Sequence, residues 1–205
     1  MGLPSPYYQD DAVTIYHGDC REVVTQRFLH EAAFCVVTDP PYPNNAGHFT
    51  ADVEDARWLL EELDCETITF WSELERPPVC LTLVAVHIWH RANVNGRPYE
   101  PAFHFSLDGE KRRSEVLRHA AIFKGAGPGC AEFLGHPTQK PVALMQRLIE
   151  KTALAIVLDP FAGVGSTLRA AKNLGRRAIG IEIEERYCEI AAKRCAQEVL
   201  ALDVA

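Results

Sequence analysis

The segment from 156 to 183 constrains the fold more than any other, because it reads as strand, turn, helix and strand. A short apolar strand is predicted at Ile156–Leu158, helical spacing follows over Ser166–Leu174, and a second strand is predicted at Ala178–Ile183. Two strands joined through a helix lie parallel in one sheet, and helices cover both faces of such a sheet. The segment therefore predicts an α/β fold.

The rest of the chain repeats this alternation. A continuous apolar run, Ala33–Thr38, is expected to be a strand buried on both faces. Further strands are predicted at Val13–Tyr16, Thr67–Trp71, Val79–Trp89 and Ala102–Leu107, the last at a sheet edge. Further helices are predicted at Arg21–Leu29, Asp52–Leu63, Pro141–Ala153 and Glu185–Leu200. The pattern predicts a mostly parallel sheet with helices on both faces, in a single domain spanning 1–205.

Length and charge limit what the chain can bind. Its 205 residues fit one domain, and a 47% apolar share is enough for a core. The formal net charge is -7, whereas duplex DNA is held largely through Lys and Arg on phosphates. Any DNA contact must therefore come from a local basic patch. The one basic stretch, 111–124, supplies the candidates Lys111, Arg112, Arg113, Arg118 and Lys124.

Cysteine and histidine spacing gives no sign of a metal site. The seven cysteines form no Cys-x-x-Cys pair, and their odd number suits a reducing cytoplasm. His87 and His90 have His-x-x-His spacing on a predicted strand, which points them to opposite faces, and His104 stands apart. We expect no metal. No signal peptide or membrane-spanning run is visible, so a soluble, cytoplasmic protein is expected.

The turn Asp159–Thr167 joins a predicted strand to a predicted helix and contains two glycines. Glycines let a ligand approach the backbone closely, and a helix N-terminus offers free N–H groups. Leu168 replaces the third glycine of a dinucleotide fingerprint, and no Walker sequence is present, so a nucleoside-like ligand other than NAD or ATP is expected. Glu182 closes the next strand and is placed to accept hydrogen bonds from ribose hydroxyls. The alternative is a solvated carboxylate, like the neighbouring Glu184 and Glu185.

Asp39-Pro40-Pro41-Tyr42 follows the buried strand at Ala33–Thr38. Ligands of α/β sheets bind beyond the carboxyl ends of the strands. The carboxylate, the Pro40 carbonyl and the aromatic ring share one rigid turn, a set that suits a planar base bearing an amino group. The ring would stack on the base while the two oxygens accept the hydrogens of the amine. The alternative is a proline turn with a buried tyrosine.

These motifs carry a family resemblance. Asp39–Tyr42, then His136-Pro137-Thr138-Gln139-Lys140-Pro141, then Asp159–Thr167 resemble the β-class (circularly permuted) DNA amino-methyltransferases, in which the catalytic half precedes the cofactor half. Enzymes with Asn-Pro-Pro-Tyr that act on RNA or protein glutamine place the glycine turn first. The resemblance covers Val13 to about Leu200, and small stand-alone enzymes of this type occur in phages and bacteria. It implies a Rossmann-like methyltransferase fold with a mostly parallel seven-stranded sheet.

The resemblance also implies S-adenosylmethionine as methyl donor and DNA as partner, and it allows a homodimer. Gly163–Thr167 and Thr138–Lys140 would hold the methionine end, Phe161 would lie near the sulfonium, and Asp19 and Cys20 would lie near the adenine. The residues implied to bind the cofactor are Asp19, Cys20, Thr138, Lys140, Asp159, Phe161, Gly163, Gly165, Ser166, Thr167 and Glu182. A catalytic half is expected at 13–106, a short DNA-recognition segment at 107–135 and a cofactor half at 136–200.

The predicted activity is methylation of the exocyclic amine of adenine in DNA, as in restriction-modification systems, with Asp39, Pro40, Pro41 and Tyr42 as catalytic residues. The target atom is inaccessible within a duplex, so base flipping is expected. Cytosine amino-methylation is the first alternative, although relatives with that activity more often carry Ser where Asp39 stands. A catalytically idle DNA- or cofactor-binding protein is the second alternative, and the intact motif speaks against it.

Overall fold

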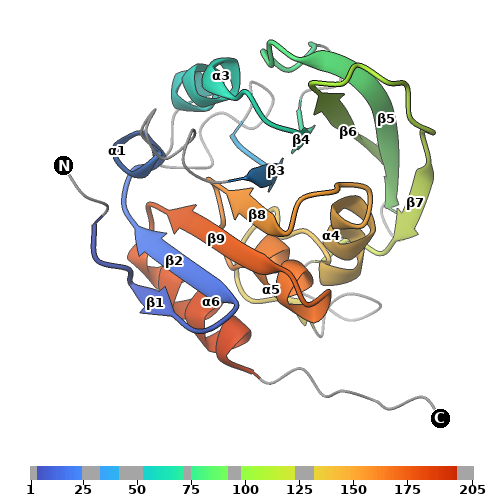
Figure 1. Ribbon diagram of the computed structural model, residues 1–205. Helices are drawn as coiled ribbons and strands as arrows, with labels where there is room; N and C mark the ends of the chain where they lie inside the picture. The colour runs from blue at the N-terminus through green and yellow to red at the C-terminus, as the bar shows by residue number, and fades with distance from the viewer. Residues whose placement is uncertain are drawn as a thin grey trace.

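The computed structural model describes residues 4–24, 33–41, 53–71, 75–91, 98–122 and 132–197. In this part of the chain, strands form one nine-stranded sheet in the order β1-β2-β9-β8-β3-β4-β6-β5-β7 (Figure 1). The strands are β1 (Tyr8–Gln9), β2 (Val13–His17), β3 (Phe34–Thr38), β4 (Thr67–Phe70), β5 (Thr82–Arg91), β6 (Tyr99–Ser106), β7 (Val116–His119), β8 (Ile156–Asp159) and β9 (Arg177–Glu182). The helices are α1 (Cys20–Val23), α3 (Val53–Glu62), α4 (Val142–Ile149), α5 (Ser166–Asn173) and α6 (Glu185–Ala196).

Five neighbouring strands, β2, β9, β8, β3 and β4, all run parallel. Every residue of β3 and β4 is buried, as expected for strands covered on both faces. β6 then runs antiparallel between β4 and β5. The predicted mostly parallel sheet is therefore confirmed, and the carboxyl ends of β2, β3, β8 and β9 meet at one edge.

The structure corrects two details of the predicted sheet. It has nine strands in the described residues where seven were expected, because it adds β1, a two-residue strand antiparallel to β2, and β7, which pairs with β5 and lies within the expected recognition segment. The prediction of an edge strand at Ala102–Leu107 is wrong, because β6 lies between β4 and β5. Its alternation of polar and apolar residues suggested exposure, but His104 is fully buried. Its Nε2 is hydrogen-bonded to Glu66 Oε1 at 3.0 Å.

Helices α4, α5 and α6 pack side by side against the sheet, with α5 on β8 and β9 and α6 on β2 and β9 (Figure 1). Gly165 precedes α5 with a φ of 75°, a conformation that favours glycine. A Cβ there would lie 2.9 Å from Cβ of Ala191 in α6. Gly165 thus allows the turn after β8 to pack directly on α6. No helix among the described residues is long and apolar enough to cross a membrane.

Candidate active site

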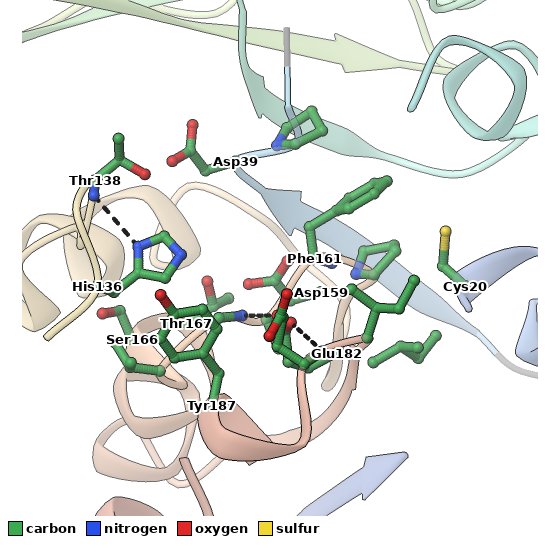
Figure 2. A pocket seen from close by; sticks show the side chains of 18 of the residues that line it. Cys20, Asp39, His136, Thr138, Asp159, Phe161, Ser166, Thr167, Glu182 and Tyr187 are labelled. Carbon is green, nitrogen blue, oxygen red and sulfur yellow. Dashed lines mark hydrogen bonds between the residues drawn. The ribbon is translucent and has the colours of Figure 1, made fainter. Parts of the chain in front are cut away.

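A cavity of about 370 Å³ lies at the carboxyl ends of β2, β3, β8 and β9. Its walls come from the turns that follow these four strands and from the segment that precedes α4. In Figure 2, Asp39 lies on one side and Asp159, Thr167 and Glu182 on the other. The carboxyl edge of parallel strands is where α/β sheets bind their ligands.

Most residues that the sequence indicated come together here. Those lining the cavity are Asp19, Cys20, Asp39, Pro40, Pro41, Thr138, Lys140, Asp159, Phe161, Gly163, Ser166, Thr167 and Glu182. Gly165 is not among the lining residues, because it packs against α6 instead. Tyr42 and Lys124 lie outside the described residues.

Glu182 holds the glycine turn at the end of β9 through hydrogen bonds. Its Oε2 accepts a hydrogen bond from the Gly163 N–H at 2.7 Å, and its Oε1 accepts one from the Glu184 N–H at 2.8 Å. Burial raises the pKa of the Glu182 carboxyl. Each oxygen of a carboxylate can accept a further hydrogen bond. The buried Glu182 is therefore no solvated carboxylate, and it retains acceptor capacity toward a ligand.

Asp159 connects the turn after β8 with the strand that leads to Asp39. Its Oδ1 accepts hydrogen bonds from the Thr38 hydroxyl at 2.7 Å and from the Phe161 N–H at 3.2 Å. Burial raises the pKa of the Asp159 carboxyl, and these hydrogen bonds oppose that effect. The contacts fix the two turns relative to each other, although they are far apart in sequence.

Sequence reasoning did not assign His136 and Tyr187 to the site. The two rings meet edge to face with centroids 4.7 Å apart, and both line the cavity (Figure 2). The Thr138 N–H lies 3.3 Å from His136 Nδ1, and burial lowers the pKa of His136 to about 4. His136 is thus neutral at neutral pH. Its place at the start of the His-Pro-Thr motif was a usable signal, whereas Tyr187 has none.

Asp39 and Lys140 form an ion pair at the catalytic side of the cavity. Lys140 Nζ lies 2.5 Å from Asp39 Oδ2 and 3.0 Å from Glu100 Oε1. Lys140 also lies over the Phe70 ring, with Nζ 4.6 Å from the centroid. Lys140 belongs to the segment expected to hold the methionine end of the cofactor, but its ammonium group is engaged by carboxylates of the protein itself.

The other oxygen of Asp39 has no partner among the described residues. In the described part of the chain, Asp39 Oδ1 is buried and has no hydrogen-bond partner. Burial raises the pKa of Asp39 to about 6, with Lys140 opposing this effect. A buried acceptor without a partner costs about 1–3 kcal/mol, so such atoms call for an explanation. A donor supplied by a bound substrate would provide one.

The basic stretch is divided between two edges of the sheet. Lys111 donates to the Leu83 carbonyl near the amino end of β5, at the edge opposite the cavity. Arg112 pairs with Asp108 at 2.8 Å and with Glu66 at 3.5 Å. Arg113 follows at the same edge and is exposed, whereas the exposed Arg118 lies near the carboxyl end of β7. Contact of these residues with DNA stays a prediction. The position of Lys111–Arg113 at the edge opposite the cavity does not favour it.

Two of the histidines considered for metal binding lie in the core. The His87 and His104 rings lie 5.7 Å apart, and burial lowers the pKa of His87 to about 4. Within the described ranges, no group of three or more suitable side chains is placed to hold a metal ion.

Comparison with known proteins identifies relatives in the same functional class. A family described as DNA methylase matches residues 84–193. The predicted methylase YubD of Escherichia coli (strain K12) is 31% identical over 209 residues, covering 87% of this chain and 88% of that protein. The type II methyltransferase M.ScaI of Streptomyces caespitosus is 35% identical over 94 residues, covering 45% of this chain but 31% of that protein. These relatives are bacterial, and they do not indicate a phage origin.

Solved structures give the same result for the fold. The complex of M1.HpyAVI with S-adenosylmethionine is 25% identical, with a TM-score of 0.67, and the match covers 90% of this chain and 100% of that one. The cytosine-N4-specific PvuII DNA methyltransferase is 16% identical, with a TM-score of 0.69 and coverage of 96% and 90%. The second likeness concerns the fold alone. The predicted Rossmann-like methyltransferase fold is confirmed.

Proposed function

The chain belongs to the DNA methylase family, and we propose that it transfers a methyl group from S-adenosylmethionine to the exocyclic amine of adenine in DNA. The family confirms the expected class of enzyme and its methyl donor, whereas adenine rather than cytosine is the finer proposal. One observation carries the proposal: a carboxylate, Asp39, presents a buried oxygen without a partner at the cavity, in the described part of the chain.

The residues present fit the methyl donor. When bound, S-adenosylmethionine supplies an electrophilic methyl group on a sulfonium. Gly163 has a φ of 51°, and its missing side chain leaves space beside the His136 ring, where a Cβ would lie 3.5 Å from Nε2. Glu182 would accept the ribose hydroxyls with its remaining lone pairs. The turn ahead of α5 and Thr138 would hold the methionine end, and Asp19 and Cys20 would lie near the adenine.

Asp39 and Pro40 would activate the target amine. The amine is a poor nucleophile because its lone pair is delocalised into the ring. Asp39 Oδ1 and the Pro40 carbonyl would accept its two hydrogens and favour tetrahedral geometry at nitrogen. The nitrogen would then bond to the methyl carbon as the bond of that carbon to sulfur breaks, and it would give up one proton, for which Asp39 is the nearby acceptor. Positioning would supply most of the acceleration.

A labelled-methyl assay on mixed-sequence DNA tests the proposed reaction. The DNA would be incubated with the protein and S-adenosylmethionine carrying a tritiated methyl group, and its nucleosides would be separated after digestion. Label in N6-methyldeoxyadenosine is the expected result. Label confined to N4-methyldeoxycytidine would replace adenine by cytosine as the target, and the absence of label from DNA would favour an idle binding protein.

The pH dependence of turnover reports the charge of Asp39. The ionised Asp39 carboxylate accepts a hydrogen of the amine more strongly than the protonated acid does, and the Asp39 pKa is about 6. We therefore expect the turnover rate to reach its plateau above this pH and to fall as the pH decreases through it. Asp39→Asn keeps an acceptor oxygen that does not titrate, so it should lose the acid limb while retaining part of the turnover. An unchanged acid limb in Asp39→Asn would assign the titration to another group.

Glu182→Ala should weaken binding of S-adenosylmethionine by roughly 10- to 100-fold in calorimetry, since hydrogen bonds to a charged acceptor are lost. The change also releases the Gly163 N–H that orders the turn. Glu185→Ala, at an exposed position nearby, is the matched control and should leave affinity close to that of the wild type. Equal affinities of the Glu182→Ala variant and the wild-type protein would remove Glu182 from the ribose role.

A further inference from the structure

We propose that Lys140 and Glu100 are positioning residues that orient the Asp39 carboxylate and set its charge, and that the Lys140 ammonium does not hold the methionine end of the cofactor. The inference rests on the proposed function, because it concerns how that carboxylate accepts the target amine. It departs from the expectation that the family resemblance implied for Lys140.

The three charged groups come from separate elements and meet in a partly buried cluster. Asp39 follows β3, Glu100 lies near the amino end of β6, and Lys140 precedes α4. Because β6 is antiparallel to β4, its amino end lies at the carboxyl edge of the parallel strands, beside Asp39. Lys140 is 6% exposed and lies within 3.0 Å of both carboxylates. Removing either carboxylate would leave the buried Lys140 ammonium less compensated, so the cluster is a defined arrangement and not a solvated contact.

The cluster contacts only one of the two oxygens of the Asp39 carboxylate, and this contact orients the group. Lys140 engages Asp39 Oδ2, whereas Oδ1 is buried and lacks a partner among the described residues. With Oδ2 held, the plane of the carboxylate is restricted. Oδ1 is thereby kept for an incoming hydrogen-bond donor.

The groups around Asp39 shift its pKa in opposite directions. Burial, Glu100 and Asp159 raise the Asp39 pKa, whereas Lys140 lowers it both as a charge and as a hydrogen-bond donor. Arg91 Nη1 lies 3.9 Å from Glu100 Oε2 and partly offsets that acidic neighbour. Lys140 therefore favours the ionised carboxylate that the proposed reaction needs, and Glu100 limits this effect.

Lys140 also links the two halves of the site through its backbone. The Ser166 hydroxyl, at the start of α5, donates to the Lys140 carbonyl at 2.7 Å. The backbone of Lys140 thus belongs to the cofactor side of the cavity, while its ammonium reaches the catalytic side. This explains how a residue in the His-Pro-Thr-Gln-Lys-Pro motif can serve Asp39.

The test is a carbon NMR titration of the Asp39 carboxyl in the 205-residue chain, assigned with Asp39→Asn. Lys140→Met should raise the Asp39 pKa by about 1–3 units, as expected when an opposite charge at close range is lost. Glu100→Gln should move it downward, toward the ordinary value of an aspartate. The acid limb of turnover should shift in the same direction as the titration in each variant. Calorimetry should show affinity for S-adenosylmethionine close to wild type in both.

A purely structural role would not shift the Asp39 pKa upward in Lys140→Met and downward in Glu100→Gln. Unshifted Asp39 titrations would overturn the inference, and so would a large loss of S-adenosylmethionine affinity in Lys140→Met. Glu100→Gln is nearly isosteric and decides the matter if Lys140→Met does not fold. Lys140→Arg, which keeps the charge, should leave the Asp39 titration near that of the wild type. Absence of methyl transfer by the wild-type protein would refute the proposed function instead, while the titration would still decide this inference.

Discussion

Asp39→Ala is expected to lower turnover by about 100- to 1,000-fold, the loss typical of removing one preorganised electrostatic partner. DNA affinity should change little. Charge develops on the amine nitrogen only as the methyl group transfers, so an acceptor such as Asp39 Oδ1 acts mainly in the transition state. The buried position of this oxygen strengthens its interaction with the amine.

Single-turnover kinetics and fluorescence anisotropy with DNA measure the two effects separately. Asp39→Asn is the matched control, because its amide oxygen can still accept a hydrogen, and it should be far less impaired than Asp39→Ala. Near-normal turnover in Asp39→Ala would contradict the catalytic role of the motif.

Tyr42→Ala is expected to weaken capture of the flipped base by about 1–3 kcal/mol, the value of one base–aromatic stacking contact. Tyr42 lies outside the described residues, so this expectation depends on its place after Asp39-Pro40-Pro41 in the sequence. Tyr42→Phe and Tyr42→Trp keep the stacking face and should retain much of the activity.

The emission of 2-aminopurine at the target position reports flipping, because the base brightens when it leaves the stack. The wild-type protein and Tyr42→Phe should raise this emission, and Tyr42→Ala should raise it far less. An equal rise with all three proteins would remove the stacking role from Tyr42.

The sequence was most informative where local rules decide the structure. The runs that became β3, β8 and β9 were predicted within a residue or two, because each is apolar and ends at a marked turn. The same turns, after Asp39 and after Asp159, carry the candidate site. Since parallel strands place their carboxyl ends at one edge, the meeting of these turns followed from the fold class.

Contacts between distant residues could not be predicted in this way. Lys140 and Asp39 are 101 residues apart, and no periodicity links them or adds Glu100. The edge assignment of β6 failed for a related reason, because a buried histidine paired with a carboxylate looks like an exposed position in the sequence. Likewise, a basic run does not reveal that Arg112 pairs with the carboxylates of Asp108 and Glu66.

Methylation of adenine by way of Asp39 can be measured in DNA from cells that lack their own adenine methylase. Wild-type protein and Asp39→Ala would be expressed to equal levels, and the nucleosides of the cellular DNA would be measured by mass spectrometry. We expect N6-methyladenine with the wild-type protein and almost none with Asp39→Ala. N4-methylcytosine in place of N6-methyladenine, or equal N6-methyladenine with both proteins, would contradict it.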